Sequence, residues 1–165
     1  MRLFVAAGLP PVARAACAAW GPDERALVRV GEPALHLTLA FLGEVGDPTP
    51  LPARLAPCAA PARGLALVGG RWLPPRRPRV LALEVDDPAG ELRALQARVA
   101  HALDHTEGRP FLPHVSVARV RGRLRPGALP PAPTVRFDAV ALTLFRSALG
   151  SGPPRYEALW SANLT

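Results

Sequence analysis

Four residues on two short segments have the types and the spacing needed to hold a phosphate. His36 and Thr38 lie two positions apart in segment 35–41 (LHLTLAF), where leucines alternate with other residues. This period of two predicts a β-strand that presents the imidazole and the hydroxyl on one face, about 6.5 Å apart. His114 and Ser116 repeat the arrangement in segment 114–119 (HVSVAR). Two copies of one strand pattern require a common explanation.

Two such strands facing each other would supply the groups that displacement at phosphorus requires. The attacking and leaving oxygens lie roughly in line on opposite sides of phosphorus, so one imidazole could serve each side. An unperturbed histidine pKa of about 6.5 allows one ring to act as base and the other as acid near neutrality. The hydroxyls of Thr38 and Ser116 could donate to the non-bridging oxygens, where charge develops. The sequence alone leaves the acid and the base interchangeable.

No pattern in the sequence predicts a metal site or a cofactor. The two motifs have no accompanying carboxylate cluster, and His101 and His105, spaced by four, have no third ligand nearby. We interpret that pair as a solvated helix end, where positive charge suits the helix dipole. Cys17 and Cys58 fit no disulfide framework or ligand spacing, so we expect both to be buried and reduced.

The elements that must position the motifs occur twice in the same order. Each half is expected to contain a strand, a helix opened by proline, a histidine strand and a later strand. Arg2 precedes His36 by 34 positions, and Arg79 precedes His114 by 35. The expected strands are 2–8, 35–42 and 64–72 in the first half and 79–85, 114–119 and 135–145 in the second, and the expected helices are 10–20 and one that begins at Pro88 after an Asp87 cap.

This repetition predicts an α+β fold in which one domain, 1–165, is a duplicated unit. The two pseudo-symmetric lobes would correspond approximately to 1–75 and 76–165, with exchange of strands between them allowed. We expect antiparallel sheets around a central cleft, helices on the outer faces, and the two histidine faces turned toward each other. Trp20, Trp72 and Trp160 are expected to pack in the core rather than to stack on bases.

The composition indicates an anionic partner. The 165-residue chain has a formal net charge of +7, and its 20 basic residues are all arginine, which suits phosphate and bases but would also follow from GC-rich coding. Arginine alternates from Arg119 to Arg125 and clusters at 76–79. Each of these residues alone predicts solvated surface, whereas the set favours contacts to an RNA backbone. No run of about 18 apolar residues occurs, so we expect a soluble, cytoplasmic protein.

Taken together, several segments resemble the bacterial and archaeal RNA 2',3'-cyclic phosphodiesterases, also called 2'-5' RNA ligases, of the two-histidine (2H) phosphoesterase superfamily. Ser116 departs from the family, which usually has threonine there, but it keeps the hydroxyl. The segments are 2–6 (RLFVA), 35–44 (LHLTLAFLGE), 111–119 (FLPHVSVAR), 144–147 (LFRS), and the tail residues Leu149, Gly150, Gly152, Pro153 and Tyr156.

The resemblance implies an enzyme, independent of metal, ATP or other cofactor, that opens an RNA 2',3'-cyclic phosphate end to a 2'-phosphate. His36 would be the general acid that protonates the departing 3'-oxygen, and His114 the general base that activates water. Arg119 would bind the phosphate, and Phe41 would stack on the nucleobase. Reversal with an RNA 5'-hydroxyl would form a 2'-5' linkage. The expected partner is RNA with cyclic phosphate ends, bound by a monomer.

Phe41 and Arg119 share an offset of five residues from their histidines. Regular pleating would place both on the face opposite the imidazoles, so a role in the site requires a bulge or twist just before them. Phe41 fits the core equally well by composition, whereas Arg119 is harder to bury.

Two other functions remain open: a phosphodiesterase for small cyclic nucleotides, and a non-enzymatic RNA-binding module with structural histidines.

Overall fold

The computed structural model describes residues 1–148, 150 and 152–165. Leu149 of the tail motif lies outside them. The helices are α1 (Pro11–Ala19), α2 (Leu51–Leu55) and α3 (Glu91–Ala102), with short 3₁₀ turns at Glu32–Ala34 and Ala56–Cys58. The strands are β1 (Arg2–Gly8), β2 (Leu27–Arg29), β3 (His36–Glu44), β4 (Leu65–Leu73), β5 (Val80–Asp86), β6 (His114–Val120), β7 (Arg136–Phe137), β8 (Ala141–Ala148) and β9 (Arg155–Asn163).

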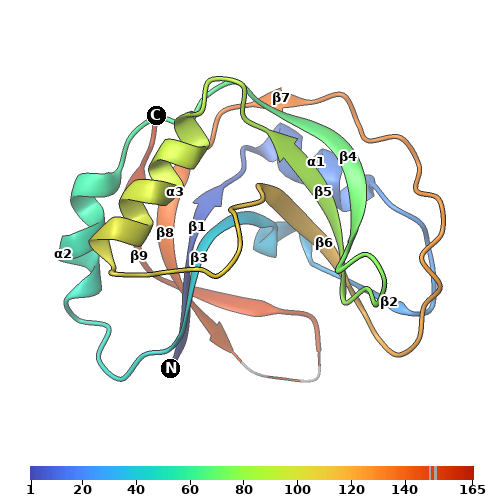
Figure 1. Cartoon of the computed structure of the whole chain (residues 1–165), viewed down its shortest axis with the longest axis horizontal. Coiled ribbons are helices and arrows are strands. Elements are labelled where there is room, and N and C mark those ends of the chain that lie inside the picture. The colour runs from blue at the N-terminus through green and yellow to red at the C-terminus, as the bar shows by residue number, and fades with distance from the viewer. Residues whose placement is uncertain (149, 151) are drawn as a thin grey trace.

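One antiparallel sheet runs through the described residues in the order β7-β4-β5-β6-β3-β1-β8-β9, with β2 beside β6. β3 and β6 meet at its centre through the single pair Leu37 and Val115, and the sheet curls away on either side (Figure 1). We name β3, β1, β8 and β9 the His36 lobe, and β6, β5, β4, β7 and β2 the His114 lobe. The antiparallel α+β fold predicted from the sequence is confirmed.

The order of strands is symmetric about the centre of the sheet. β5 and then β4 follow β6 on one side, as β1 and then β8 follow β3 on the other. Each half of the sequence therefore places a later long strand in the other lobe, with β4 beside β5 and β8 beside β1. The division into halves at 1–75 and 76–165 stays a prediction about the domain, but the sheet combines strands from both.

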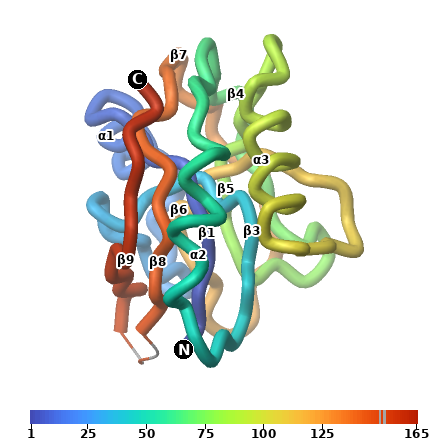
Figure 2. Tube along the Cα trace, turned by 90° about the vertical axis from the view of Figure 1, so that its left-hand side faces the viewer, coloured from blue at the N-terminus to red at the C-terminus, as the bar shows by residue number. Residues whose placement is uncertain are grey.

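The helices lie on the outside and also cross between the halves. α3 follows β5 in the chain but lies against β3, where the Gln96 side-chain amide donates to the Leu39 carbonyl at 3.4 Å. α2 and α3 cover the outer face of the His36 lobe (Figure 2). α1 lies against β6 and β7 of the other lobe. None of the helices in the described residues is long and apolar enough to cross a membrane.

β3 contains a β-bulge three residues after its histidine. Its pairing with β1 shifts between Thr38 and Ala40, so Leu39 has no partner across the ladder. Leu39 and Ala40 are consequently both buried, and the alternation of faces is reversed beyond them. Phe41 returns to the face of His36 and is 62% exposed.

β6 contains the same bulge at the equivalent position. Its pairing with β5 shifts between Ser116 and Ala118 and leaves Val117 without a partner. Val117 and Ala118 are both buried, and Arg119 is exposed on the face of Ser116. The break in the pleat that the sequence required before Phe41 and Arg119 is thus present in both strands.

Two expected elements differ in the structure. α3 begins at Glu91 and not at Pro88, because residues 88–90 form a turn in which Gly90 has a φ of 73°. The Asp87 carboxylate still caps the helix, accepting from the backbone amides of Leu92 at 3.2 Å and Arg93 at 2.9 Å. The single strand expected over 135–145 is two strands, since the chain leaves β4 after β7 and joins β1 as β8.

Two tryptophans hold the proline-rich connection between β6 and β7 against the sheet. The Trp20 indole N–H donates to the Pro131 carbonyl, and the Trp72 indole N–H donates to the Gly127 carbonyl, both at 3.0 Å. Gly70 allows the first contact, since a Cβ there would clash with the Trp20 ring. Trp20 and Trp72 are buried, as predicted, and Trp160 is half-buried.

Candidate active site

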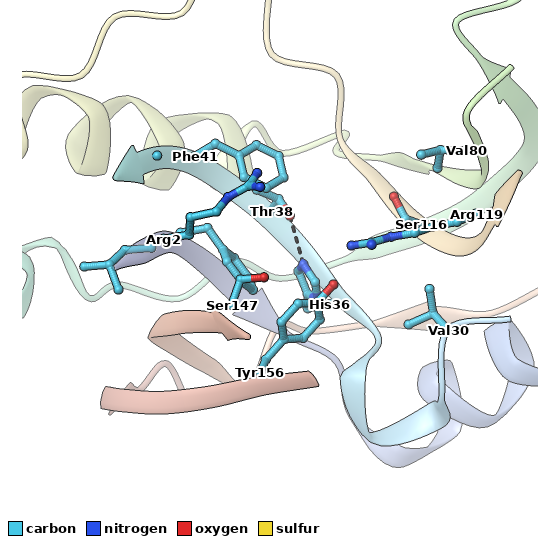
Figure 3. A pocket seen from close by; sticks show the side chains of 13 residues that line it. Arg2, Val30, His36, Thr38, Phe41, Val80, Ser116, Arg119, Ser147 and Tyr156 are labelled. Carbon is cyan, nitrogen blue, oxygen red and sulfur yellow. Dashed lines mark hydrogen bonds between the residues drawn. The ribbon is translucent and has the colours of Figure 1, made fainter. Parts of the chain in front are cut away.

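A cavity of about 240 Å³ lies where the two lobes meet. β3 contributes His36, Thr38 and Phe41 to its lining, and β6 contributes Ser116 and Arg119 from the other side (Figure 3). Five of the six site residues predicted from the sequence therefore line one cavity. The sixth, His114, lines the adjoining cavity, which is described below.

The His36 ring is held at both nitrogens. Nδ1 donates to the Ala34 carbonyl at 2.7 Å, and Ala34 ends the short 3₁₀ turn that precedes β3. This bond places the proton of the neutral ring on Nδ1, so Nε2 accepts from the Thr38 hydroxyl at 2.9 Å. The turn is itself fixed by Arg14 of α1, which donates to the Pro33 carbonyl at 2.9 Å. The backbone thus sets the tautomer and directs Nε2 toward Thr38.

His36 lies in an aromatic cluster on the inner side of its lobe. The ring centroids of Phe4 and Tyr156 are 4.9 Å and 5.2 Å from that of His36, and Phe145 stacks on Phe4 at 5.2 Å. Burial lowers the pKa of His36 to about 4, against the Ala34 hydrogen bond, which raises it; the charges of His114 and Arg14 lower it further. With no anion bound, His36 is therefore neutral at pH 7.

His114 has the same backbone anchor but a different surrounding. Its Nδ1 donates to the Leu112 carbonyl at 2.7 Å, as His36 does to Ala34, so its Nε2 is likewise free of the ring proton in the neutral form. His114 lines a cavity of about 450 Å³ that adjoins the first and shares Thr38, Phe41 and Val80 with it. Thr38 thus lines both cavities, one of which contains His36 and the other His114.

Arg119 joins the lobes through Tyr156. Its guanidinium extends from β6 toward the Tyr156 side chain of β9 (Figure 3), and both residues line the cavity. Burial raises the pKa of Tyr156, and the positive charge of Arg119 opposes that rise. This arrangement holds a cation at the cavity beside His36, where a bound anion would be stabilised.

Four polar or aromatic residues of the His36 lobe also line the cavity and were not predicted as site residues. These are Arg2, Phe4, Ser147 and Tyr156. The alternation of β1 could have indicated Arg2 and Phe4, since both lie on one face of that strand and Phe4 pairs with Phe41. Tyr156 resembled the family tail, but only the pairing of β9 with β8 brings it near His36. Arg146 of the same tail instead forms an ion pair with Glu157 at 3.9 Å.

The pair His101 and His105 forms no metal site in the part of the chain that the structure describes. No three His, Cys, Asp or Glu side chains gather there in a way that could hold an ion. His105 instead lies 3.2 Å from Glu107, and His101 belongs to the exposed last turn of α3.

The duplicated antiparallel fold and the paired His-x-Thr/Ser strands define a two-histidine phosphoesterase. More narrowly, the chain belongs to the 2'-5' RNA ligase superfamily, whose family model matches residues 9–149.

Similarity to known proteins supports both the class and the family assigned above. An RNA 2',3'-cyclic phosphodiesterase of Aeropyrum pernix is 37% identical over 94 residues, which make up 53% of each chain, so the match spans about half of that relative. The Escherichia coli K12 protein of the same name is 30% identical over 173 residues, covering 96% of this chain and 93% of its own. The apo crystal structure of E. coli LigT superposes with a TM-score of 0.81 at 28% identity, covering 99% of this chain and 97% of its own. LigT has also been crystallised with 3'-AMP and with phosphate.

Proposed function

We propose that the protein hydrolyses the 2',3'-cyclic phosphate at the end of an RNA to a 2'-phosphate, and that the cavity between the lobes is the active site. The observation that carries this proposal is the double bulge, since it turns Phe41 and Arg119 onto the faces of the two His-x-hydroxyl motifs. A chain that used its histidines only structurally would need neither bulge.

In the proposed complex the cyclic phosphate occupies the space between Thr38 and Ser116. The two hydroxyls donate to the non-bridging oxygens, and Arg119 supplies the positive charge for the transition state. Phe41, which is exposed and lines both adjoining cavities, stacks on the terminal base. The crystallisation of E. coli LigT with 3'-AMP and with phosphate agrees with a protein that binds phosphate groups.

His36 is the proposed general acid. It must be protonated to act as one, and the bound substrate must favour that protonation. The free ring is neutral at pH 7 because its pKa is about 4, but a bound phosphate anion raises that pKa by placing a negative charge beside the ring. Once protonated, Nε2 donates and no longer accepts, which releases the Thr38 hydroxyl to the phosphate. His36 then protonates the 3'-oxygen as the P–O3' bond breaks.

His114 is the proposed general base. Its Nδ1 proton is held by the Leu112 carbonyl, so Nε2 can accept a proton from water. The water oxygen bonds to phosphorus opposite the departing 3'-oxygen, which leaves a 2'-phosphate and a 3'-hydroxyl. The same groups in the same roles would join an RNA 5'-hydroxyl, in place of water, to the cyclic phosphate, which forms a 2'-5' linkage as the P–O3' bond breaks.

All proposed groups come from one chain, so we expect the monomer to be active.

Cys17 and Cys58 are buried and free, and burial raises the pKa of the Cys17 thiol to about 11. Both thiols should therefore stay reduced and inert, which agrees with our proposal of a cytoplasmic location.

An assay of end chemistry tests the proposal. An oligoribonucleotide with a 2',3'-cyclic phosphate is incubated with the protein in EDTA, and the product is compared by chromatography with oligonucleotides that end in a 2'-phosphate, a 3'-phosphate or the cyclic phosphate. We expect a 2'-phosphate from wild-type protein and from His101→Gln, which changes a histidine outside both cavities. Formation of a 3'-phosphate, or no turnover, would contradict the proposal.

A further inference from the structure

A second basic region lies beyond the proposed active site. It is a groove of about 760 Å³ between the β4–β5 connection and the segment that follows β6. The two segments are joined where the Val120 amide donates to the Arg79 carbonyl at 2.8 Å. We name this region the arginine groove, and the arginines that line it are Arg76, Arg77, Arg79, Arg123 and Arg125.

The charge of the groove is not balanced within the chain. Its other lining residues are Pro78, Gly122 and Leu124, so it contains no carboxylate. Among the described residues, Arg54, Arg63, Arg71, Arg93 and Arg146 each lie beside a carboxylate, whereas the five groove arginines form no ion pair there. Gathering like charges without counter-charges is unfavourable, and a polyanion would relieve it. The guanidinium groups suit phosphates in particular.

The groove is continuous with the proposed active site. The cavity that contains His114 shares Thr38, Phe41 and Val80 with the cavity of His36, and it shares Arg79 with the arginine groove. Most residues that line this intervening cavity are apolar, among them Leu73, Pro74 and Phe111, and the charges of Glu107 and Arg109 offset each other, as expected for a region that contacts bases rather than phosphates. The three hollows therefore form one path.

We propose that the arginine groove binds the backbone phosphates of the RNA on the 5' side of its cyclic end. This inference rests on the proposed function, because a cyclic phosphate is the 3' terminus and the strand can leave the site only in the 5' direction. It makes oligonucleotides the preferred substrates over cyclic mononucleotides, which fill the cavities of His36 and His114 but do not reach the groove. The proposal also gives different roles to the arginines that alternate from Arg119 to Arg125. Arg119 contacts the reacting phosphate, and Arg123 and Arg125 contact the backbone phosphates of the strand.

The test compares a cyclic mononucleotide with 2',3'-cyclic phosphate RNAs of two, four and eight nucleotides. We expect kcat/KM of the wild-type protein to rise at least about tenfold along this series at low salt. Arg77→Gln/Arg123→Gln should lose most of that gain, with a deficit that grows with length. Each lost phosphate contact should reduce the slope of log(kcat/KM) against log[salt] by about 0.7 for the octamer.

Arg25→Gln/Arg136→Gln is the matched control, since it removes the same charge from exposed positions that form no ion pair among the described residues and lie outside the cavities described above. It should retain the length dependence, and thermal melting should verify that both variants are folded. Equal losses in the two variants, or a kcat/KM independent of length in wild type, would overturn the groove proposal. Absence of turnover on every substrate would instead overturn the proposed function.

Discussion

The two histidines occupy equivalent positions on equivalent strands, yet the structure surrounds them differently. Each donates Nδ1 to the carbonyl two residues earlier, and each is followed by a hydroxyl and a bulge. His36 is enclosed by the rings of Phe4 and Tyr156, and its pKa is lowered to about 4. His114 instead opens toward the path that leads to the arginine groove.

The difference between the enclosed His36 and the open His114 fits the proposed action of a duplicated unit on one asymmetric substrate. In the proposed mechanism both sides of the phosphate need the same groups, which agrees with the likeness of the motifs, and the proposed RNA strand extends on one side only, which agrees with the difference between the flanking elements. We expect the enclosed side to control the protonation of the leaving oxygen and the open side to admit water and the strand. The following predictions test this contrast, from the largest expected effect to the smallest.

Loss of either imidazole should affect both sides of the reaction alike. His36→Gln and His114→Gln should each lower kcat by about 10³-fold or more, because each removes one proton-transfer group. The double variant should lose little beyond the worse single variant, since the two groups act in one transition state. Single-turnover rates with the cyclic octamer provide the measurement. A single variant that retains wild-type kcat would contradict the joint role.

The enclosure of His36 should also appear as an acid-dependent loss of stability. Its pKa of about 4 lies below the usual value of 6.5, so the unfolded chain binds a proton more readily than the folded one. Stability from the neutral ring is therefore complete above about pH 6.5 and decreases as the pH falls toward 4, by about 3 kcal/mol. Urea unfolding across this range should show a smaller loss for His36→Gln. An identical pH dependence would contradict the enclosure.

The positive charge at the reacting phosphate comes from the other lobe. Arg119→Gln should lower kcat/KM by about 100-fold, because it removes a charge-assisted contact in the transition state. Tyr156→Phe retains the ring beside His36 but removes the hydroxyl that faces the guanidinium across the cavity, so it should give a smaller loss of the same kind. If Tyr156→Phe were as damaging as Arg119→Gln, orientation and not charge would be the main contribution.

Phe41 should act on binding and not on chemistry. Phe41→Ala should raise KM about tenfold with little change in kcat, because a stacked base contributes roughly 1–3 kcal/mol. Phe41→Tyr preserves the stacking surface and should behave as wild type. Val68→Ala, at another exposed apolar position, controls for loss of surface hydrophobicity. A change in kcat alone would place Phe41 in a different role.

The sequence predicted the site through its repeated pattern, and the pattern had a clear physical limit. Period-two alternation identifies the His36 and His114 strands. A role for Phe41 and Arg119 in the site required a bulge or twist before them, and the structure contains a bulge in each strand. Alternation could not show which strands are neighbours, because pairing depends on contacts between residues far apart in the chain. The position of Tyr156 beside His36 could therefore not be predicted, since it depends on the pairing of β9 with β8.

The sequence did not predict the start of α3 or the division of segment 135–145 correctly, because the local residue pattern there also fits a longer helix or strand. Pro88 is a suitable first residue for a helix, and Asp87 does cap α3, but Gly90 adopts a left-handed conformation that delays the helix to Glu91. In the same way, segment 135–145 is mostly apolar, and only the transfer of the chain from β4 to β1 divides it into β7 and β8.

The most direct test of the central claim is a crystal structure of the protein with 2'-AMP, which carries the phosphate of the proposed product. We predict one phosphate group between the lobes, with Nε2 of His36 and Nε2 of His114 both within about 3.2 Å of its oxygens, on opposite sides. The Thr38 hydroxyl should then contact the phosphate and no longer His36. A phosphate that touches only one imidazole, or that occupies only the arginine groove, would contradict the account.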